Sequence, residues 1–478
     1  MRDRNGAKER CQSGSESVTR HRPRLMPRDD ILSKFDLGVR HPALDSLRRA
    51  YATLHLSQRA PLEERSQKQL QLASVLVRHA KDNVPLYRDL YRDVEEIRSW
   101  EDFRAVPILT RDLASQAPLE DRTAEKSAPD SAPVEMVETS GTTGKKVTVL
   151  RSTRTEVWRS ACKLLEYDWM GLDPRRSCAS IRFDVGPNVR GYDSRLNCVV
   201  TNSWEEPLLG RLLPFGRGYV FRVGSKETVV ADTLREVRPE YISATPTMLE
   251  SLSSALDGPM FEIAMTIGET LYEPVRERLA SHFGCRIFDT YGTREIGRIA
   301  VECPDTRNYH VHDYNVIVEI LDDHGKPGNP GETGHVVLTS LHNLATPMIR
   351  YKLGDLATLG GRCPCGRTMT TIERLEGREV SRVVLRDGRK RLARHVSKAL
   401  QDVEGFGPFL LRQKDYNVFE LVVEEGSRGT QKDFEEARRG LSDLVEEPVT
   451  LTVTRVASLP PLPSGKRTRF VIDFTPEA

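Results

Sequence analysis

One short stretch of the sequence combines hydroxyls, glycines and a positive charge: Ser140, Gly141, Thr142, Thr143, Gly144 and Lys145. Glycines let backbone amides converge on an anion, hydroxyls donate further hydrogen bonds and the lysine adds charge, so this loop could hold a polyphosphate. Its spacing differs from a Walker A loop, which requires GxxxxGK and then Ser or Thr between a strand and a helix. Apolar alternation at Val134 and Met136, and at Val147 and Val149, predicts strand–loop–strand. A surface turn is the alternative interpretation.

Further polar residues follow predicted strands. A strand predicted at 286–288 leads into Asp289, Thr290, Tyr291, Gly292, Thr293, Arg294 and Glu295. Glu295 suits Mg²⁺, which takes a few oxygen ligands beside substrate phosphates. Gly268 and Glu269 close a strand predicted at 263–267, and open α/β sheets bind ligands at strand ends. Asp355 could accept hydrogen bonds from ribose hydroxyls, whereas Lys466, near the carboxyl terminus, is by itself a solvated charge.

Three cysteines and a histidine have the composition of a metal site. Cys303 and His310 lie close in sequence, and Cys363 and Cys365 form a CxC pair. Three thiolates and one imidazole make a common tetrahedral zinc set, and four protein ligands leave no open position, so the metal would be structural. His312 is a rival for the fourth position. The alternative is unpaired reduced thiols beside a hydrogen-bonded histidine, the interpretation that we also favour for His335 and His342.

Composition narrows the class of protein. With 478 residues the chain should hold two or more domains. Its 71 basic and 69 acidic residues balance to a net charge of +2, which favours neither nucleic acid nor a membrane surface as a partner. The sequence contains no uncharged apolar run of about 18 residues, so we expect no transmembrane helix. Eight cysteines are too few for a disulfide scaffold, and we expect a reducing, cytoplasmic setting.

The pattern along the chain predicts how these residues are positioned. Residues 1–30 lack periodicity and are expected to be a disordered tail. From 134 to about 372, short β-type runs alternate with helical ones (229–237, 247–256 and 273–283), which predicts α/β layers with a β-rich part after His310. Beyond Arg378 the pattern is that of a small α+β domain, with helices at 393–403 and 431–444.

Taken in order, these segments resemble the adenylate-forming superfamily, and within it the phenylacetate–CoA ligase branch, including relatives associated with capsule biosynthesis. The resemblance runs from about His79 to Phe470. It is supported by residues 83–87 (Asn-Val-Pro-Leu-Tyr), 107–113 (Pro-Ile-Leu-Thr-Arg-Asp-Leu) and 363–368 (Cys-Pro-Cys-Gly-Arg-Thr), the last similar to a CxCGRT signature. The resemblance implies a large, multi-layered α/β adenylation domain over 31–377 with a β-rich insert, and a small, mobile α+β domain over 378–478.

The resemblance also implies a role for each motif. Ser140 to Lys145 would hold the β- and γ-phosphates of ATP, with the Asp289–Thr293 segment in the same site. Gly268 and Glu269 would lie beside the adenine and ribose, and Tyr291 against the base. Asp355 would bind the ribose hydroxyls, Arg378 the ribose or phosphate, and Glu295 Mg²⁺. Lys466 would bridge the attacking carboxylate and the α-phosphate, and some relatives share the Cys…His…CxC arrangement.

The implied reaction is activation of a carboxylic acid through an acyl-adenylate, followed by thioester formation with coenzyme A. Because an anion must approach a polyanion, catalysis consists mainly of positioning and charge neutralisation. Transfer to a carrier-protein thiol or an amine is an alternative second step, and a non-catalytic nucleotide-binding scaffold is an alternative of another class. The assembly could be a homodimer. The acid pocket is expected from 181–184, 241–246 and the residues before Gly268.

Three positions depart from the family pattern. Arg294 replaces the usual Thr or Ser before the metal-binding glutamate, although an arginine there could still contact phosphate. Lys146 replaces a common proline after the phosphate loop. Val380 replaces the usual aspartate of the hinge motif Gly-Arg-x-Asp, which bears on the rotation of the small domain between half-reactions.

Overall fold

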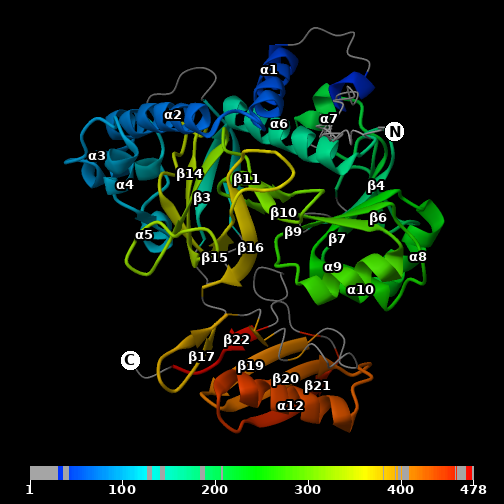
Figure 1. Ribbon diagram of the computed structural model, residues 1–478. Coiled ribbons are helices and arrows are strands. Elements are labelled where there is room, and N and C mark those ends of the chain that lie inside the picture. The colour runs from blue at the N-terminus through cyan, green and yellow to red at the C-terminus, as the bar shows by residue number, and fades with distance from the viewer. Residues whose placement is uncertain are drawn as a thin grey trace, which may run out of the picture.

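The structure, a computed structural model, describes residues 31–35, 42–125, 132–139, 146–182, 189–205, 208–379, 382–392, 395–396, 400, 409–457, 459 and 470–475 (Figure 1). Four predicted features lie outside the described residues: the tail at 1–30, the phosphate loop at 140–145, Val380 and Lys466. The same holds for most of the helix predicted at 393–403. No described helix combines the length and the apolar character that crossing a membrane requires.

A 14-stranded sheet forms the centre of the described structure, in the order β13-β14-β15-β16-β12-β11-β10-β9-β8-β4-β7-β6-β5, with β1 paired to β15. The strands are β1 (Leu109–Thr110), β4 (Cys178–Arg182), β5 (Tyr192–Asp193), β6 (Cys198–Thr201), β7 (Gly218–Arg222), β8 (Tyr241–Ala244), β9 (Ile263–Ile267), β10 (Arg286–Thr293), β11 (Gly297–Glu302), β12 (Tyr309–Val311), β13 (Val316–Leu321), β14 (Thr333–Ser340), β15 (Tyr351–Leu359) and β16 (Thr371–Arg378). Strands β7, β4, β8, β9 and β10 are parallel, so their carboxyl ends share one edge. The predicted mixed α/β fold is thereby confirmed.

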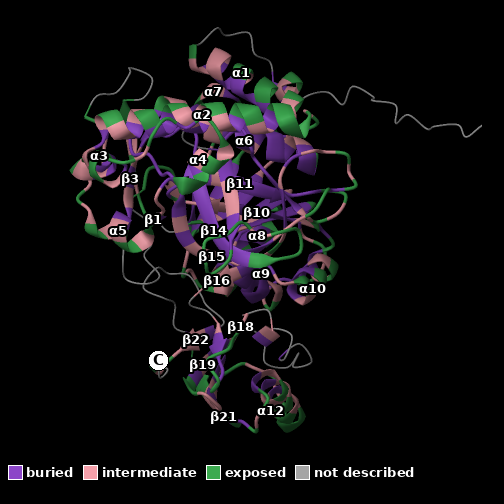
Figure 2. Ribbon diagram, turned by 60° about the vertical axis from the view of Figure 1, so that its left-hand side comes forward, coloured by how far each residue is buried: buried purple, intermediate pink, exposed green. Residues whose placement is uncertain are grey.

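Helices cover both faces of the parallel strands, because alternate strand residues are apolar on each side. Tyr241 and Met265 pack towards α1 (Pro42–Ser57) and α6 (Thr153–Met170). Ile242 and Ala264 pack towards α8 (Glu227–Val237), α9 (Pro246–Ser253) and α10 (Glu273–Phe283). Figure 2 shows the buried residues gathered in the strands and the exposed ones on the outer helix faces. Two short helices, η1 (Ile31–Lys34) and α7 (Leu209–Leu212), complete this part.

The antiparallel strands β13–β16 pack against a helical segment near the amino terminus. That segment contains α2 (Leu62–Asn83), α3 (Pro85–Leu90), α4 (Trp100–Ala105), α5 (Arg111–Gln116) and η2 (Glu120–Arg122). A hairpin of β2 (Pro133–Glu138) and β3 (Thr148–Ser152) lies on the same core, which confirms the strand–loop–strand prediction.

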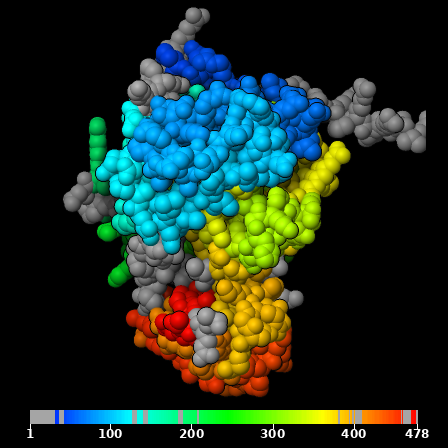
Figure 3. Space-filling view, turned by 90° about the vertical axis from the view of Figure 1, so that its left-hand side faces the viewer, coloured from blue at the N-terminus to red at the C-terminus, as the bar shows by residue number. Residues whose placement is uncertain are grey.

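Described residues beyond β16 build separate sheets. Strands β17 (Val383–Val384) and β18 (Lys390–Arg391) form a hairpin, and β21 (Thr450–Val456), β20 (Val418–Glu424), β19 (Phe409–Asp415) and β22 (Phe470–Ile472) form a four-stranded sheet. Helix α12 (Gln431–Val445) packs on that sheet. Thr430 and Asp433 form a capping box at its amino terminus, in which the side chain of each accepts a hydrogen bond from the backbone N–H of the other. This small core contains no described residue before Val383. The space-filling view shows these residues as a separate lobe (Figure 3).

One strand is longer than predicted. The sequence favoured a strand at 286–288 followed by a loop, but β10 continues to Thr293 because it pairs with β11 after a register shift between Tyr291 and Gly292. A Cβ atom at Gly292 would lie 2.7 Å from the carbonyl oxygen of Gly297, so this irregular pairing requires glycine.

Candidate active site

The carboxyl edge of the parallel strands carries the predicted Gly-Glu motif. Gly268 directly follows β9 and has a φ of +88°, in the left-handed region that favours glycine. The Oε2 atom of Glu269 accepts hydrogen bonds from Thr247 N at 3.2 Å and from Thr247 Oγ1 at 2.7 Å. Thr247 is in the first turn of α9, where a carboxylate is favoured by the helix dipole. Glu269 therefore holds the start of α9 against the end of β9.

Three residues predicted to contact the nucleoside lie together, although Tyr291 is on β10 and the other two are on the paired strands β15 and β16. The Tyr291 hydroxyl of β10 donates to Asp355 Oδ2 of β15 at 2.8 Å. The Arg378 guanidinium of β16 pairs with Asp355 Oδ1 at 2.9 Å, since Asp355 and Arg378 are opposite each other in the β15–β16 register. Burial, followed by the charge of Asp355, raises the pKa of Tyr291 well above its usual range, so its hydroxyl stays a donor. A phenol, a carboxylate and a guanidinium thus form one hydrogen-bonded row.

Glu295 lies in a buried ion pair next to this row. Arg111 Nη1 is 3.2 Å from Glu295 Oε1, and the two side chains are 13% and 4% exposed. The same guanidinium contacts the hydroxyls of Tyr351 at 3.4 Å and Thr139 at 3.4 Å. Arg111 lies within residues 107–113, a stretch that supports the family resemblance but implies no role for it. Its 184-residue separation from Glu295 leaves no local signal of the contact.

The hairpin β2–β3 brings both ends of the predicted phosphate loop to this cluster. Glu138 pairs with Thr148, and Thr139 N donates to the Val147 carbonyl at 2.9 Å. Arg294 is exposed, and its guanidinium donates to the Glu138 carbonyl at 3.2 Å. Arg294 therefore lies at the residue pair where the loop begins. Residues 140–145 themselves, like Lys466, lie outside the described residues.

Asp289 lies in a different environment from the other predicted ATP contacts. It is 1% exposed, and its carboxylate accepts hydrogen bonds from the hydroxyls of Thr266 and Tyr309. Burial raises the pKa of Asp289 to about 6. Its neighbours Gly292 and Thr293 are the last residues of β10, and Thr293 Oγ1 accepts from Ile296 N of the following turn at 3.1 Å. Asp289, Gly292 and Thr293 thus make contacts within and next to β10, and Tyr291 is the residue of this segment whose side chain contacts Asp355.

The predicted zinc ligands meet at one place, although they come from three segments. Cys303 follows β11, His310 lies in β12, and Cys363 and Cys365 lie between β15 and β16. Their ligand atoms all lie within 4.8 Å of one another, with Cys365 Sγ 3.3 Å from His310 Nε2 and Cys363 Sγ 3.9 Å from Cys303 Sγ. His312 is not part of the cluster, because β12 ends at Val311 and the ring turns to Glu166 Oε1 at 2.9 Å.

The two remaining histidines are hydrogen bonded, as predicted. His335 Nε2 is 2.7 Å from Asp323 Oδ1. His342 Nε2 is 2.8 Å from the Tyr314 carbonyl oxygen, and its ring stacks on Trp158 with centroids 3.9 Å apart.

A cavity of about 70 Å³ lies between α6 and the carboxyl ends of the parallel strands. Arg182, Ser243 and Ile267 line it, from the three regions expected to form the acid pocket. The other wall was not expected from the sequence: it consists of Lys163, Glu166, Tyr167 and Met170 of α6 with Glu205 and Arg298. The spacing of these residues on α6 is the ordinary spacing of a helix face, so nothing in the sequence separates them from core positions.

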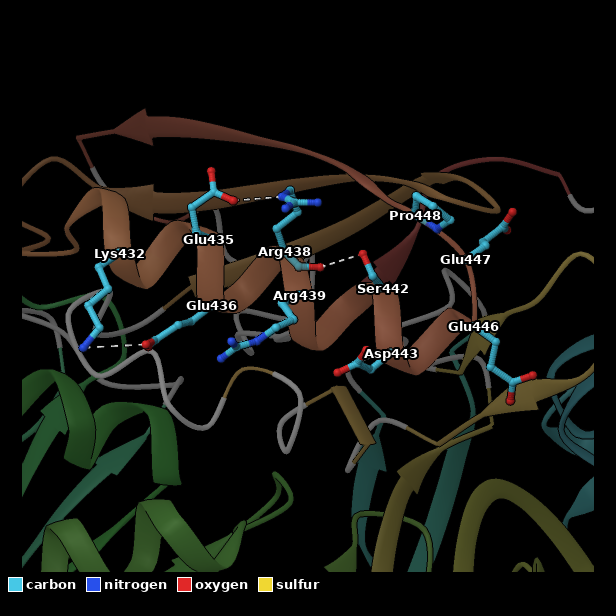
Figure 4. Close-up of a pocket in the computed structure, with 10 residues that line it drawn as sticks. All are labelled: Lys432, Glu435, Glu436, Arg438, Arg439, Ser442, Asp443, Glu446, Glu447 and Pro448. Atoms are coloured by element: carbon cyan, nitrogen blue, oxygen red, sulfur yellow. Dashed lines mark hydrogen bonds and ion pairs between the residues drawn. The ribbon is translucent and has the colours of Figure 1, made fainter.

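A second concave surface runs along α12, far from these residues in the sequence (Figure 4). Four of its charged residues form two pairs on the helix, Lys432 with Glu436 at 3.7 Å and Arg438 with Glu435 at 3.0 Å, and Glu446 pairs with Arg389 at 2.6 Å. Such exposed helix pairs are a solvated face and do not indicate a ligand site.

Known proteins share part of the sequence and the fold of this chain. The chain is 26% identical over 349 residues to "Phenylacetate-coenzyme A ligase" of Escherichia coli (strain K12), covering 68% of this chain and 74% of that protein. It is 24% identical over 356 residues to the protein of the same name from Pseudomonas putida, covering 70% and 75%. The fold matches a crystal structure of 2-hydroxyisobutyryl-CoA ligase in the postadenylation state with a TM-score of 0.71 at 17% identity, covering 92% of this chain and 95% of that one. A benzoate CoA ligase from Burkholderia xenovorans LB400 matches with a TM-score of 0.50, covering 72% and 69%.

The family model described as "AMP-binding enzyme" matches residues 46–345, a segment that includes the β2–β3 hairpin, Gly268, Tyr291 and Glu295. The resemblance to adenylate-forming enzymes of the phenylacetate–CoA ligase type is confirmed, and this chain belongs to the family of AMP-binding enzymes.

Proposed function

We propose that this enzyme activates a carboxylic acid with ATP and then transfers the acyl group to the thiol of coenzyme A. The observation that carries the proposal is the row of Tyr291, Asp355 and Arg378 beside the Glu295–Arg111 pair, in a chain of the AMP-binding family. The names of the curated relatives support coenzyme A as the acceptor.

The reaction has two balanced steps. A carboxylate oxygen of the acid attacks the α-phosphorus of ATP, and the bond to pyrophosphate breaks to give an acyl-adenylate. The thiolate of coenzyme A then attacks the acyl carbon, and AMP leaves. Adenylation is needed because oxide is a poor leaving group whereas AMP is a good one. The protein contributes positioning and charge neutralisation.

Each described residue of the site would have its own role in binding ATP. Asp355 would accept hydrogen bonds from the ribose hydroxyls, and Tyr291, held by Asp355 at 2.8 Å, would lie against the base. Arg378 would contact the ribose or a phosphate. Gly268 and Glu269 would border the adenine, since they lie at the same edge of the sheet. Arg294 and the hairpin loop at 140–145 would face the phosphates, because Arg294 contacts Glu138, two residues before that loop.

Glu295 would hold Mg²⁺. The fit is supported by its environment: the carboxylate is 4% exposed and already pairs with a cation, so the position favours positive charge. When bound, Mg²⁺ would neutralise phosphate charge. Arg111, whose Nη1 is 3.2 Å from Glu295 Oε1, would hold the Glu295 carboxylate in its orientation. Residues 378–478 would form a mobile domain that brings Lys466 to the α-phosphate.

Zn²⁺ would be held by Cys303, His310, Cys363 and Cys365 as a structural ion. Tetrahedral coordination at a Zn–S distance of about 2.3 Å separates two sulfur ligands by about 3.8 Å. The Cys303–Cys363 separation of 3.9 Å fits that geometry and is far too long for a disulfide. The set would join the β11–β12 turn to the loop between β15 and β16.

The proposal is tested by steady-state kinetics on Asp355→Asn. The variant keeps the shape but loses the charge, so the KM for ATP should rise at least about tenfold while the KM for coenzyme A stays unchanged. Asp232→Asn, at an exposed position of α8 whose side chain is 76% exposed, is the matched control and should behave as the wild type. An unchanged KM for ATP in Asp355→Asn would contradict the proposed nucleotide site. Replacing coenzyme A by a carrier protein or an amine in the same assay identifies the acceptor.

A further inference from the structure

The cavity beneath α6 adjoins the proposed nucleotide site. Ile267 and Thr290 line it, and the next residues in the chain, Gly268 and Tyr291, belong to that site. An acid bound in the cavity would therefore have its carboxylate at the strand ends, where Arg182 at the end of β4 is exposed and has no ion pair with another described residue. The cavity is thus the place for the tail of the acid.

The walls of this cavity are unusually polar. Ten of its fourteen lining residues, Cys178 not counted, carry charged or hydrogen-bonding side chains, whereas ligand pockets for apolar molecules are lined mainly by hydrophobic groups. Two ion pairs are buried in the wall. Lys163 Nζ is 2.6 Å from Glu205 Oε2, and Arg298 Nη1 is 3.1 Å from Glu166 Oε2. The side chains of these pairs are 12% and 5%, and 15% and 0% exposed.

Further hydrogen bonds hold both carboxylates in place. The Tyr167 hydroxyl donates to Glu205, and His312 Nε2 is 2.9 Å from Glu166 Oε1. Buried ion pairs are seldom more stable than apolar residues of the same volume, because desolvation offsets the attraction. The stability of the fold therefore does not explain why two buried ion pairs line one cavity. Recognition of a polar ligand does explain it.

The charged residues that line the cavity indicate which kind of polar ligand it can bind. Inside the cavity two cations, Lys163 and Arg298, are matched by the carboxylates of Glu205 and Glu166, so a charged tail would enter without a free counter-ion. Two neutral groups are available instead. Ser180 and Ser243 are opposite each other in the β4–β8 register, and neither hydroxyl makes a hydrogen bond to a described residue. Neighbouring free hydroxyls between fixed charges suit a neutral tail that both donates and accepts.

Resting on the proposed function, we infer that the acid is a short monocarboxylic acid whose tail carries a hydroxyl group, and that Ser180, Ser243 and the Lys163–Glu205 pair recognise that hydroxyl. The cavity sets the length: 70 Å³ accommodates about five water-sized groups, at roughly 10–15 Å³ each. A phenyl ring would leave the hydroxyls of Ser180 and Ser243 without hydrogen-bond partners.

The test compares acids that differ in one group. Pyrophosphate release by the full-length enzyme is measured with 3-hydroxybutyrate, butyrate, phenylacetate, succinate and β-alanine. A site built to bind a hydroxyl rejects the analogue that lacks it strongly, so kcat/KM for 3-hydroxybutyrate should exceed that for butyrate at least about 100-fold. The anionic and cationic tails of succinate and β-alanine should react no better than butyrate. Preference for butyrate, phenylacetate or a charged tail would overturn the inference and leave acid activation intact.

A variant tests the assigned residues. Ser180→Ala with Ser243→Ala removes both hydroxyls at small volume change, and should reduce the 3-hydroxybutyrate-to-butyrate ratio about tenfold or more without changing the KM for ATP. An unchanged ratio would contradict the assignment. If no acid releases pyrophosphate, the proposed function fails, and calorimetric binding of the same acids then decides the inference separately. Binding of 3-hydroxybutyrate but not butyrate would support it, and equal or absent binding would overturn it.

Discussion

The buried pair of Arg111 and Glu295 allows a quantitative prediction. Arg111→Met removes the guanidinium at similar volume and leaves Glu295, 4% exposed, without its counter-ion. Breaking a buried ion pair from one side costs about 3–5 kcal/mol, and the 13% exposure of Arg111 places this pair near the lower end, at about 3 kcal/mol. Glu295→Gln keeps the shape and removes the negative charge, for a loss of about 2–3 kcal/mol. The double variant contains neither charge, so it should lose only about 2–3 kcal/mol in total.

Urea unfolding of the four proteins measures this cycle. The coupling free energy between the two side chains should be about 2 kcal/mol or more, because each single variant leaves an unpaired buried charge. Arg294→Met is the control: this neighbouring arginine is exposed and donates to a backbone carbonyl, so its loss should change the free energy of unfolding by no more than about 0.5 kcal/mol. Additive single-variant losses, with coupling below about 0.5 kcal/mol, would refute the view that Arg111 and Glu295 stabilise each other as a buried ion pair.

Three further predictions concern stability. The purified protein should contain about one zinc per chain, and chelation or Cys363→Ser should lower its melting temperature; zinc-free protein with unchanged melting after chelation would rule the ion out. Burial lowers the pKa of His342 from 6.5 to about 3, so the folded state binds fewer protons than the unfolded state in this window. The free energy of unfolding should therefore decline as pH falls below 6.5, by about 1.4 kcal/mol per pH unit from this residue. His342→Gln lacks this contribution, so the difference in free energy of unfolding between wild type and variant should narrow in urea titrations from pH 6.5 to 4. A gap independent of pH would contradict this. Gly292→Ala should lose about 1–3 kcal/mol because its Cβ would lie 2.7 Å from a backbone carbonyl oxygen, whereas Gly361→Ala, with its nearest neighbour at 3.9 Å, should be close to neutral in the same unfolding assay.

The sequence by itself determined the elements whose pattern is local. Strand β9 (Ile263–Ile267) and helix α10 (Glu273–Phe283) have the bounds predicted from their periodicity. The prediction of β10 ended too early because its last residues are strand only through pairing with β11, and pairing is not visible in the pattern of one segment. The motif residues Tyr291, Asp355 and Arg378 could be named from the sequence because their spacing resembles a family.

Only the tertiary structure decided which side chains meet. Arg111 reaches Glu295 across 184 residues, and Glu166 of α6 meets both Arg298 and His312, contacts that no local spacing predicts. The thiol and imidazole groups were recognisable by type, with His310 in the predicted set and His312 as its rival; the structure adds the reason, because β12 ends at Val311 and the four predicted ligands meet. Periodicity reports which face of an element is buried, whereas the partners on that face depend on how separate elements pack. The polar lining of the cavity likewise depends on how α6 packs against the strands.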